Sequence, residues 1–324
     1  MLRQLLNAKI GLLASLMFLL LGCSTVPQQP APPEANTREA QFVHARTLYQ
    51  QGQFEQAVEG YQQAAQPGTD ERGHAYAQNN LGVMYYQGKG IPQDFKQAKH
   101  WFRLAAQQGL AEAQYNLAQL YYHGEGVAVN FAEALHWYQK AAQQQDIKAQ
   151  YQLGQMYFAG EGVDADFDQA HHWFQQAAQQ GDIQAQYQLA QMYYHGEGIE
   201  QNSTEAIKWY QKAATQGDIK AQSQLGYLYY QGEGVPQQLD KAVYWFTKAA
   251  EQGDASAQNN LGRLYFTGEG IEQDLILAYQ WVRLAAEQGD PKASKALEFL
   301  VFKLSPTHLA EGERRAQQQL ARLK

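Results

Sequence analysis

The sequence predicts an all-α solenoid of paired helices, first because it is built from a regular repeat. A stretch that opens with Ala recurs every 36 residues, at Ala77, Ala113, Ala149, Ala185, Ala221, Ala257 and, in reduced form, Ala293. Units repeated at a period of this size stack so that each buries its apolar face only against its neighbours. The functional question therefore concerns one surface that is displayed six times.

The second observation is the spacing inside each copy. Counted from the opening Ala, small or apolar residues recur at positions 1, 5, 8, 9 and 12, and again at positions 22, 25, 26, 29 and 30. Spacings of three and four residues place side chains on one face of a helix. Each copy is thus expected to hold two short antiparallel helices, here called A and B.

Glycine-containing turns are expected to end both helices. Gly-Glu-Gly follows helix A in copies two to six, beginning at Gly124, Gly160, Gly196, Gly232 and Gly268. Helix B usually ends in Gln-Gly-Asp, and glycine is the residue that most easily adopts a left-handed C-terminal cap. In the second copy this glycine is replaced by Gln145, which we expect to cost about 1 kcal/mol. Because the Gly-Glu-Gly turn recurs in every one of these copies, turn geometry explains it better than a phosphate loop or a catalytic carboxylate.

Several motifs carry a family resemblance. Leu81-Gly82 with Tyr85, followed by Ala98 and Phe102, resembles the tetratricopeptide pattern. The 36-residue period, the Gly-x-Gly turn and the block Trp137-Tyr138…Ala141-Ala142 are closer to its Sel-one-like subfamily, over residues 77–292. The resemblance implies a right-handed α/α superhelical solenoid that binds other proteins, often as an adaptor.

The N-terminal residues 1–22 are typical of a lipoprotein signal peptide. A basic start precedes an apolar run from Ile10 to Leu21, which is too short for a comfortable transmembrane helix. Leu20-Leu21-Gly22-Cys23 resembles the bacterial lipobox, in which the cysteine is lipidated, and Ser24 resembles the signal for outer-membrane sorting. We expect an outer-membrane lipoprotein that faces the periplasm; the alternative is a buried thiol behind an uncleaved anchor.

The remaining segments are expected to tether and cap the array. Residues 23–38 contain four prolines and little apolar bulk, so they predict an extended tether. Residues 39–76 predict a tetratricopeptide-like N-terminal cap, and residues 293–324 predict C-terminal capping helices, the last of which would be capped by Thr307. Arg314, Arg315 and Arg322 in that helix leave a second interpretation open, a docking site for an acidic partner or a lipid headgroup.

Composition narrows the functional classes. The net charge is −7, and there is no clustered basic face before the last helix, so nucleic acid is not expected as a partner. Cys23 is the only cysteine, which excludes an intrachain disulfide. All six tryptophans stand at position 25 of their copies, which predicts a role in the core.

Helix-A positions 3, 7 and 11 form a variable stripe that predicts the partner-binding groove. By resemblance, helix A lines the concave side of the array. The candidate groove residues are Tyr115, Gln119, His123, Tyr151, Gln155, Tyr187, Gln191, His195, Tyr227 and Arg263. Tyrosine offers a large contact area, little rotamer entropy and a hydroxyl group. The alternative is that the Tyr side chains only pack against the next repeat.

No enzymatic site is expected. The histidines at equivalent positions of successive repeats are too far apart to share a metal ion, and no nucleophile, base and orienting group converge, so we expect no cofactor, metal or small-molecule substrate. The favoured hypothesis is a membrane-anchored periplasmic scaffold that binds a protein or peptide of the cell envelope in its groove. Family resemblance supplies two alternatives, an immunity-type inhibitor that caps a secreted effector enzyme and a β-lactamase-like hydrolase.

Overall fold

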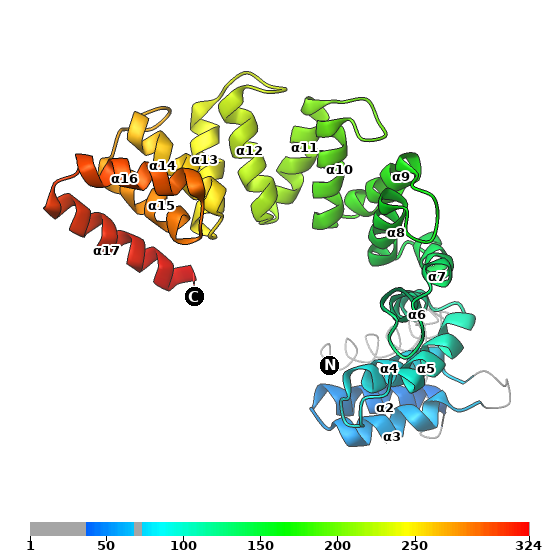
Figure 1. Cartoon of the computed structure of the whole chain (residues 1–324). Helices are drawn as coiled ribbons and strands as arrows, with labels where there is room; N and C mark the ends of the chain where they lie inside the picture. The colour runs from blue at the N-terminus through cyan, green and yellow to red at the C-terminus, as the bar shows by residue number, and fades with distance from the viewer. Residues whose placement is uncertain (1–36, 68–72, 324) are drawn as a thin grey trace, which may run out of the picture.

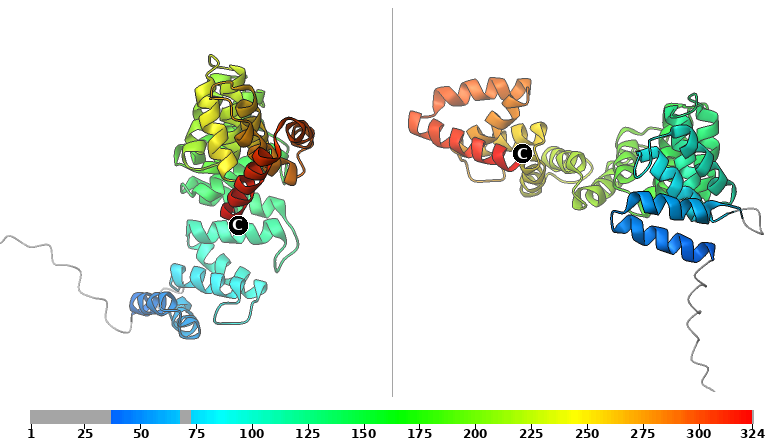
Figure 2. Two further views of the ribbon diagram at one scale, coloured as in Figure 1. Left: turned by 90° about the vertical axis from the view of Figure 1, so that its left-hand side faces the viewer. Right: turned by 90° about the horizontal axis from the view of Figure 1, so that it is seen from below.

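The computed structural model describes residues 37–67 and 73–323, and within these residues it contains sixteen helices and no strand. The helices form antiparallel pairs that stack in sequence order into a curved array (Figure 1). Two further views show that the helix axes change direction along the array (Figure 2). The predicted all-α solenoid is confirmed.

Each repeat copy supplies one pair of helices. The A helices are α4 (Ala75–Gln87), α6 (Ala111–His123), α8 (Ile147–Ala159), α10 (Ile183–His195), α12 (Ile219–Gln231) and α14 (Ala255–Thr267). The B helices are α5 (Phe95–Gln107), α7 (Phe131–Gln143), α9 (Phe167–Gln179), α11 (Ser203–Thr215), α13 (Leu239–Glu251) and α15 (Leu275–Glu287). The pair α2 (Arg38–Gln50) and α3 (Phe54–Ala65) precedes them, and α16 (Pro291–Lys303) and α17 (Pro306–Leu323) follow.

Local sequence explains where these helices begin and end. At α8, the Asp146 carboxylate accepts a hydrogen bond from the Ala149 amide at 2.8 Å, and Gly160 ends the helix in the left-handed conformation with φ of 74°. Such a cap satisfies backbone groups that the helix itself leaves unpaired. The first glycine of the turn after helix A is left-handed in all six copies, as predicted.

Gln145 adopts the turn that glycine forms in the other copies. Its φ is 65°, and it is the only non-glycine residue with a positive φ in the described part of the chain. The equivalent Gly181 has a φ of 97°. The turn itself is therefore kept, and the expected energetic cost arises because a glutamine must adopt the left-handed conformation there.

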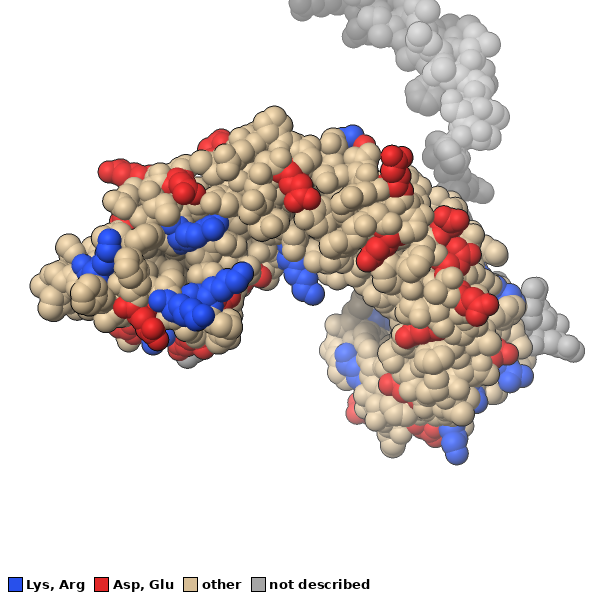
Figure 3. Space-filling model, turned by 45° about the horizontal axis from the view of Figure 1, so that its top comes forward, with Lys and Arg blue, Asp and Glu red and all other residues tan. Residues whose placement is uncertain are grey.

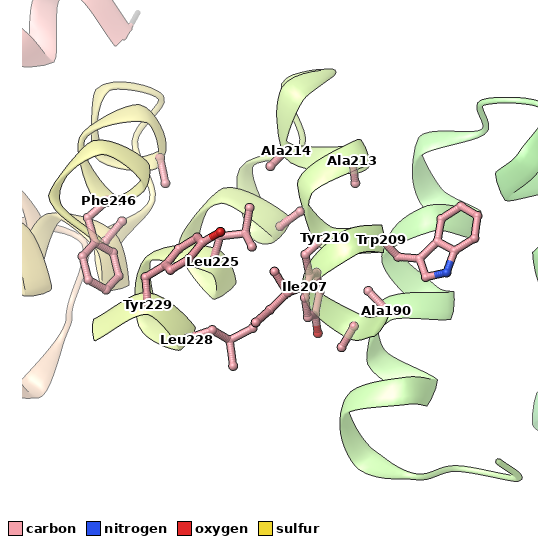
Figure 4. Packing of buried hydrophobic residues seen from close by; sticks show 14 of the residues in the cluster. Ala190, Ile207, Trp209, Tyr210, Ala213, Ala214, Leu225, Leu228, Tyr229 and Phe246 are labelled. Atoms are coloured by element: carbon pink, nitrogen blue, oxygen red, sulfur yellow. The ribbon is translucent and has the colours of Figure 1, made fainter. Parts of the chain in front are cut away.

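The residue at position 26 forms the centre of each repeat's core. Phe102, Tyr138, Phe174, Tyr210 and Phe246 are at most 2% exposed. Helix A presents a small residue to this ring: a Cβ atom added at Gly154 would lie 2.5 Å from Cδ1 of Phe174. Figure 4 shows the equivalent packing around Tyr210 and Phe246, with Leu225 and Leu228 from α12.

The prediction that all six tryptophans lie in the core holds for only two of them. Trp209 and Trp281 are buried, whereas the other four are half-buried. Trp137 contacts the core clusters of both its own and the preceding repeat, and Trp209 extends away from Tyr210 (Figure 4). The tryptophan at position 25 thus packs at the junction between repeats, while the residue at position 26 fills the interior of its own repeat.

A buried glutamine at position 2 joins each repeat to the one before it. The Gln150 side-chain amide donates to the backbone oxygen of Ala142 at 3.3 Å, and its side-chain oxygen accepts from the Gln180 amide at 2.7 Å. Ala142 lies in the last turn of the preceding helix B, where carbonyl groups have no partner within the helix. The same two bonds recur at Gln78, Gln114, Gln186, Gln222 and Gln258.

The two ends of the array are closed by polar helices. At the C-terminal end, α17 packs on α15 and buries Ala316. The predicted cap at Thr307 is wrong, because the Ser305 hydroxyl accepts from the His308 amide and α17 already begins at Pro306. Proline is well placed at the first position of a helix, so both the cap and the start of the helix lie two residues earlier than expected.

The charges of α17 mostly satisfy one another. Arg314 and Arg315 both pair with the Glu311 carboxylate, at 2.7 Å in each case, and these guanidinium groups lower its pKa to about 2. This arrangement supports capping as the role of α17. No helix in residues 37–67 and 73–323 combines the length and apolarity that a membrane span needs. Residues 1–36, including the predicted signal peptide and Cys23, lie outside the described residues.

Substitution Gln186→Ala tests the glutamine bonds. It would remove two hydrogen bonds, one to the Ala178 carbonyl and one from the Gln216 amide. The Ala178 carbonyl keeps its bond from the Gly181 amide, and the Gln216 amide keeps its bond to the Gly181 carbonyl, so each lost bond costs about 0.5–1.5 kcal/mol. We expect the free energy of unfolding to fall by about 1–3 kcal/mol in urea denaturation followed by circular dichroism. Gln184→Ala, which alters an exposed glutamine of the same helix, is the control. Equal effects of the two substitutions would contradict this role.

Candidate interaction groove

In the N-terminal half of the array the A helices lie toward the inside of the curve. In Figure 1 this is clear for α4, α6 and α8, whose partners α5, α7 and α9 lie farther out. The variable stripe at positions 3, 7 and 11 runs along these A helices. The prediction that the stripe residues contact a partner stays a prediction, but their arrangement defines what such a partner would meet.

Three successive tyrosines form the central part of this stripe. Each ring packs in a tilted arrangement against the core aromatic residue of its own repeat: Tyr115 against Tyr138, Tyr151 against Phe174 and Tyr187 against Tyr210, with ring centroids 5.7–5.9 Å apart. This packing is within a repeat, which differs from the alternative of packing only against the next one. All three side chains are half-buried, so each keeps part of its surface accessible.

Neighbouring glutamines hold two of these hydroxyl groups. The Gln119 amide donates to the Tyr115 oxygen at 2.6 Å, and the Gln155 amide donates to the Tyr151 oxygen at 2.7 Å. Gln119 also bonds to the exposed His123 through its side-chain oxygen at 2.8 Å. Because each tyrosine oxygen accepts from an amide, its own proton is left for another acceptor.

These hydroxyl groups hold their protons more tightly than a free tyrosine does, because burial raises the pKa of each. Burial is the largest cause of the raised pKa of Tyr115, Tyr151 and Tyr187, and carboxylates in the following turns act in the same direction. Asp146 contributes at Tyr115, and Asp182 contributes at Tyr151. The centre of the stripe therefore offers hydrogen-bond donors near neutral pH, and such donors suit the carbonyl groups of a protein chain.

Three hollows follow the same stripe, and each includes a position-7 residue. The first, of about 280 Å³, is lined by Val83 with Arg46 and Tyr49 of α2. The second, of about 260 Å³, is lined by Gln155 and Ala159 with Gln188 of the next repeat. The third, of about 300 Å³, is lined by Arg263 and by residues of α16.

The remaining stripe residues are more exposed toward the C-terminal arm. Tyr227 is 42% exposed, and Arg263 lies over the ring of Tyr230 at 4.5 Å from its centroid. Gln191 is half-buried and His195 is exposed. Of the ten predicted groove residues, the structure brings together by hydrogen bonds only Gln119 with Tyr115 and His123, and Gln155 with Tyr151.

The glutamates of the Gly-Glu-Gly turns connect adjacent repeats. The Tyr122 hydroxyl donates to Glu161 at 2.7 Å, and equivalent bonds join Tyr194 to Glu233 and Tyr230 to Glu269. These bonds give Glu161, Glu233 and Glu269 a structural role, whereas Phe158 at position 10 offers no hydroxyl group to Glu197. The described residues contain no group of three or more His, Cys, Asp and Glu side chains arranged to hold a metal ion.

Two structural features escaped the sequence reasoning. The first is the bond between position 10 and the turn of the next copy, which could have been suspected because Tyr122, Tyr194 and Tyr230 each lie 39 residues before the Glu of that turn. The second is the exception at position 26, where copy six has Val282 and the other five copies have Phe or Tyr. This residue lines the third hollow.

Comparison with protein families matches the Sel1 repeat at residues 75–110, 111–146, 147–182, 183–218, 219–254 and 255–290. These six windows span most of the chain, which therefore belongs to the Sel1 repeat family, within the tetratricopeptide-like superfamily. Repeats of this class commonly mediate contacts between proteins and are typically non-enzymatic. A search among curated proteins found no match.

Solved structures support the same assignment. A protective antigen of uropathogenic Escherichia coli strains that displays an SLR fold is 35% identical, with a TM-score of 0.77 over 87% of this chain. The chain spans 61% of that antigen's length. A Sel1 repeat protein from Oxalobacter formigenes is 34% identical, with a TM-score of 0.66, and the match covers 81% of this chain and 76% of that one.

The Tyr122 to Glu161 bond predicts a pH-dependent contribution to stability. Burial, together with the bond to Glu161, raises the pKa of Tyr122 from 10 to about 12. The folded state thus holds this proton more tightly than the unfolded state, so the contribution is complete below pH 10 and is lost as the pH rises toward about 12. We expect the wild type to lose more stability than Tyr122→Phe between these pH values in urea denaturation.

Tyr76→Phe, which removes an exposed tyrosine, is the matched control for this measurement. If the free energy of unfolding of Tyr122→Phe fell as steeply with pH as that of the wild type and of the control, the Tyr122 hydroxyl and its bond would contribute nothing to the pH dependence.

Proposed function

We propose that this protein is an envelope-anchored scaffold that holds another protein, or an extended segment of one, along its helix-A stripe. The observation that carries the proposal is the row of half-buried tyrosines at Tyr115, Tyr151 and Tyr187, which repeats one surface at regular intervals. A surface repeated along an array fits a long ligand better than a compact one. The family's common role in protein contacts supports the same interpretation.

The chemistry of the row favours a polypeptide. Tyr115 and Tyr151 have hydroxyl protons that can be donated outward, because adjacent glutamines donate to their oxygens. A peptide backbone supplies carbonyl acceptors at short, regular intervals. The hollows on either side of this row could receive side chains of the same segment.

The anchor is a separate part of the proposal and depends on the sequence alone. The lipobox-like Leu20-Leu21-Gly22-Cys23 and the proline-containing residues that follow it support lipidation at Cys23 and an outer-membrane location on the periplasmic side. Membrane fractionation tests it: Cys23→Ala should release the protein from membranes, and unchanged sedimentation with them would contradict the anchor.

The groove can be tested by removing only the three hydroxyl groups. Tyr115→Phe, Tyr151→Phe and Tyr187→Phe, combined in one protein, keep the ring packing against the core and so should keep the fold. We expect a protein of residues 24–324 with these three changes to capture at least about tenfold less partner protein than the wild type captures from an envelope extract of the native cells. Loss of two or three hydrogen bonds justifies that magnitude.

Tyr244→Phe, on helix B and 53% exposed, is the matched control and should retain the partner like the wild type. Circular dichroism establishes that each variant is folded. Equal retention by the triple variant would place binding outside the tyrosine row, and failure of the wild type to retain any envelope protein would contradict the scaffold role.

A further inference from the structure

The third hollow exists because two aromatic rings are missing from the sixth repeat. Copies two to four have tyrosine at position 3 and an aromatic residue at position 26. Copies one and five lack the tyrosine but have the aromatic residue at position 26. Copy six has neither, since Asn259 and Val282 occupy the two positions. Val282 contacts Gly262 as phenylalanine does in other copies, yet it fills less space.

The resulting pocket lies between α14 and α16 and has a volume of about 300 Å³. Its apolar lining comes from Gly262, Val282, Phe266, Phe299 and Leu300. Phe299 is 48% exposed although its ring meets that of Phe266 edge to face, with centroids 5.7 Å apart. A pocket of this size and lining suits one aromatic side chain, in the place where the other repeats have their own.

The cations of this region gather at the pocket. Arg263 and Lys292 line it, and the Lys303 ammonium group lies 5.1 Å from the Phe299 ring centroid. None of the three has a carboxylate within ion-pairing distance among residues 37–67 and 73–323, and the pocket lining includes no Asp or Glu. Figure 3 shows Lys and Arg side chains gathered on this C-terminal arm, at the left of the view.

This charge contrasts with the rest of the stripe. Positions 3, 7 and 11 carry no Lys, Arg, Asp or Glu from Tyr115 to Gln231, and the whole chain has a net charge of −7. Arg263 is the first charged residue of the stripe, and α16 extends it with Lys295 and Lys303 at the equivalent positions. A basic end on a stripe that carries no charged residue from Tyr115 to Gln231 favours an acidic occupant at that end and fixes its direction.

We propose that the pocket between α14 and α16 binds an aromatic side chain of the partner, flanked by carboxylates that pair with Arg263 and Lys292. This inference rests on the proposed function, because it assigns chemistry to one end of the same groove. It makes the pocket the anchor point of an acidic segment whose remainder extends toward the tyrosine row.

The test uses the full chain, purified in mild detergent, and a fluorescent peptide Gly-Glu-Asp-Phe-Glu-Asp-Gly. One comparison peptide replaces Phe by Ala, and another replaces each acid by its amide. Binding is followed by fluorescence anisotropy. We expect the acidic phenylalanine peptide to bind at least about tenfold more tightly than either comparison peptide, and to weaken as salt screens the charges.

Val282→Phe refills the pocket with the residue that copies one, three and five have opposite the same glycine, so it should fold normally. It should weaken peptide binding at least about tenfold. Arg263→Gln with Lys292→Gln, which introduces residues found at these positions in other copies, should do the same. Lys220→Gln, the equivalent of Lys292 two repeats earlier, should leave binding unchanged.

Equal binding by Val282→Phe, equal binding of the peptide without Phe, or no binding by the wild type would overturn the inference. So would a wild-type dimer that Val282→Phe makes monomeric, because the occupant would then be a second copy of the chain. A partner that depends on the tyrosine hydroxyls but binds Val282→Phe normally would remove this inference and leave the proposed function intact.

Discussion

The architecture depends on a buried glutamine that each repeat extends to the repeat before it. In the middle of the array Gln150 satisfies the Ala142 carbonyl at the end of the preceding helix and is itself satisfied by Gln180. A buried amide left without either bond would be costly, so each pair of repeats must keep the same register. The same two bonds recur in all six copies, in keeping with the unbroken 36-residue period.

A fixed interior leaves the exposed positions of helix A free to differ. Within one framework the stripe changes from tyrosine and glutamine in the centre to Arg263 in the last full repeat. The interior itself departs from the pattern at Val282, and a pocket opens there. The two departures lie together, so one end of the groove differs from the rest in both shape and charge.

Much of this structure follows from the sequence because its causes are local. The period, the two helical faces and the left-handed glycines predicted the helix pairs and their ends, and even Gln145 kept its turn. What could not be predicted depends on contacts between residues far apart in the sequence. The glutamine after each opening Ala, such as Gln150, was not singled out, because its partners lie in other helices. The tryptophans were assigned to the interior that Phe174 and its equivalents occupy. The tyrosine row was identified as a candidate, but the packing of its rings within each repeat needed three dimensions.

The central claim is that the inner, helix-A face contacts a partner, and a photocrosslinker placed in living cells tests it most directly. Tyr227 and Tyr244 are exposed tyrosines of the same repeat, one on helix A and one on helix B, at 42% and 53%. With p-benzoylphenylalanine in place of Tyr227, irradiation should attach a discrete envelope protein to the chain. The same group in place of Tyr244 should give no such product. Crosslinks only from the Tyr244 position would contradict the account.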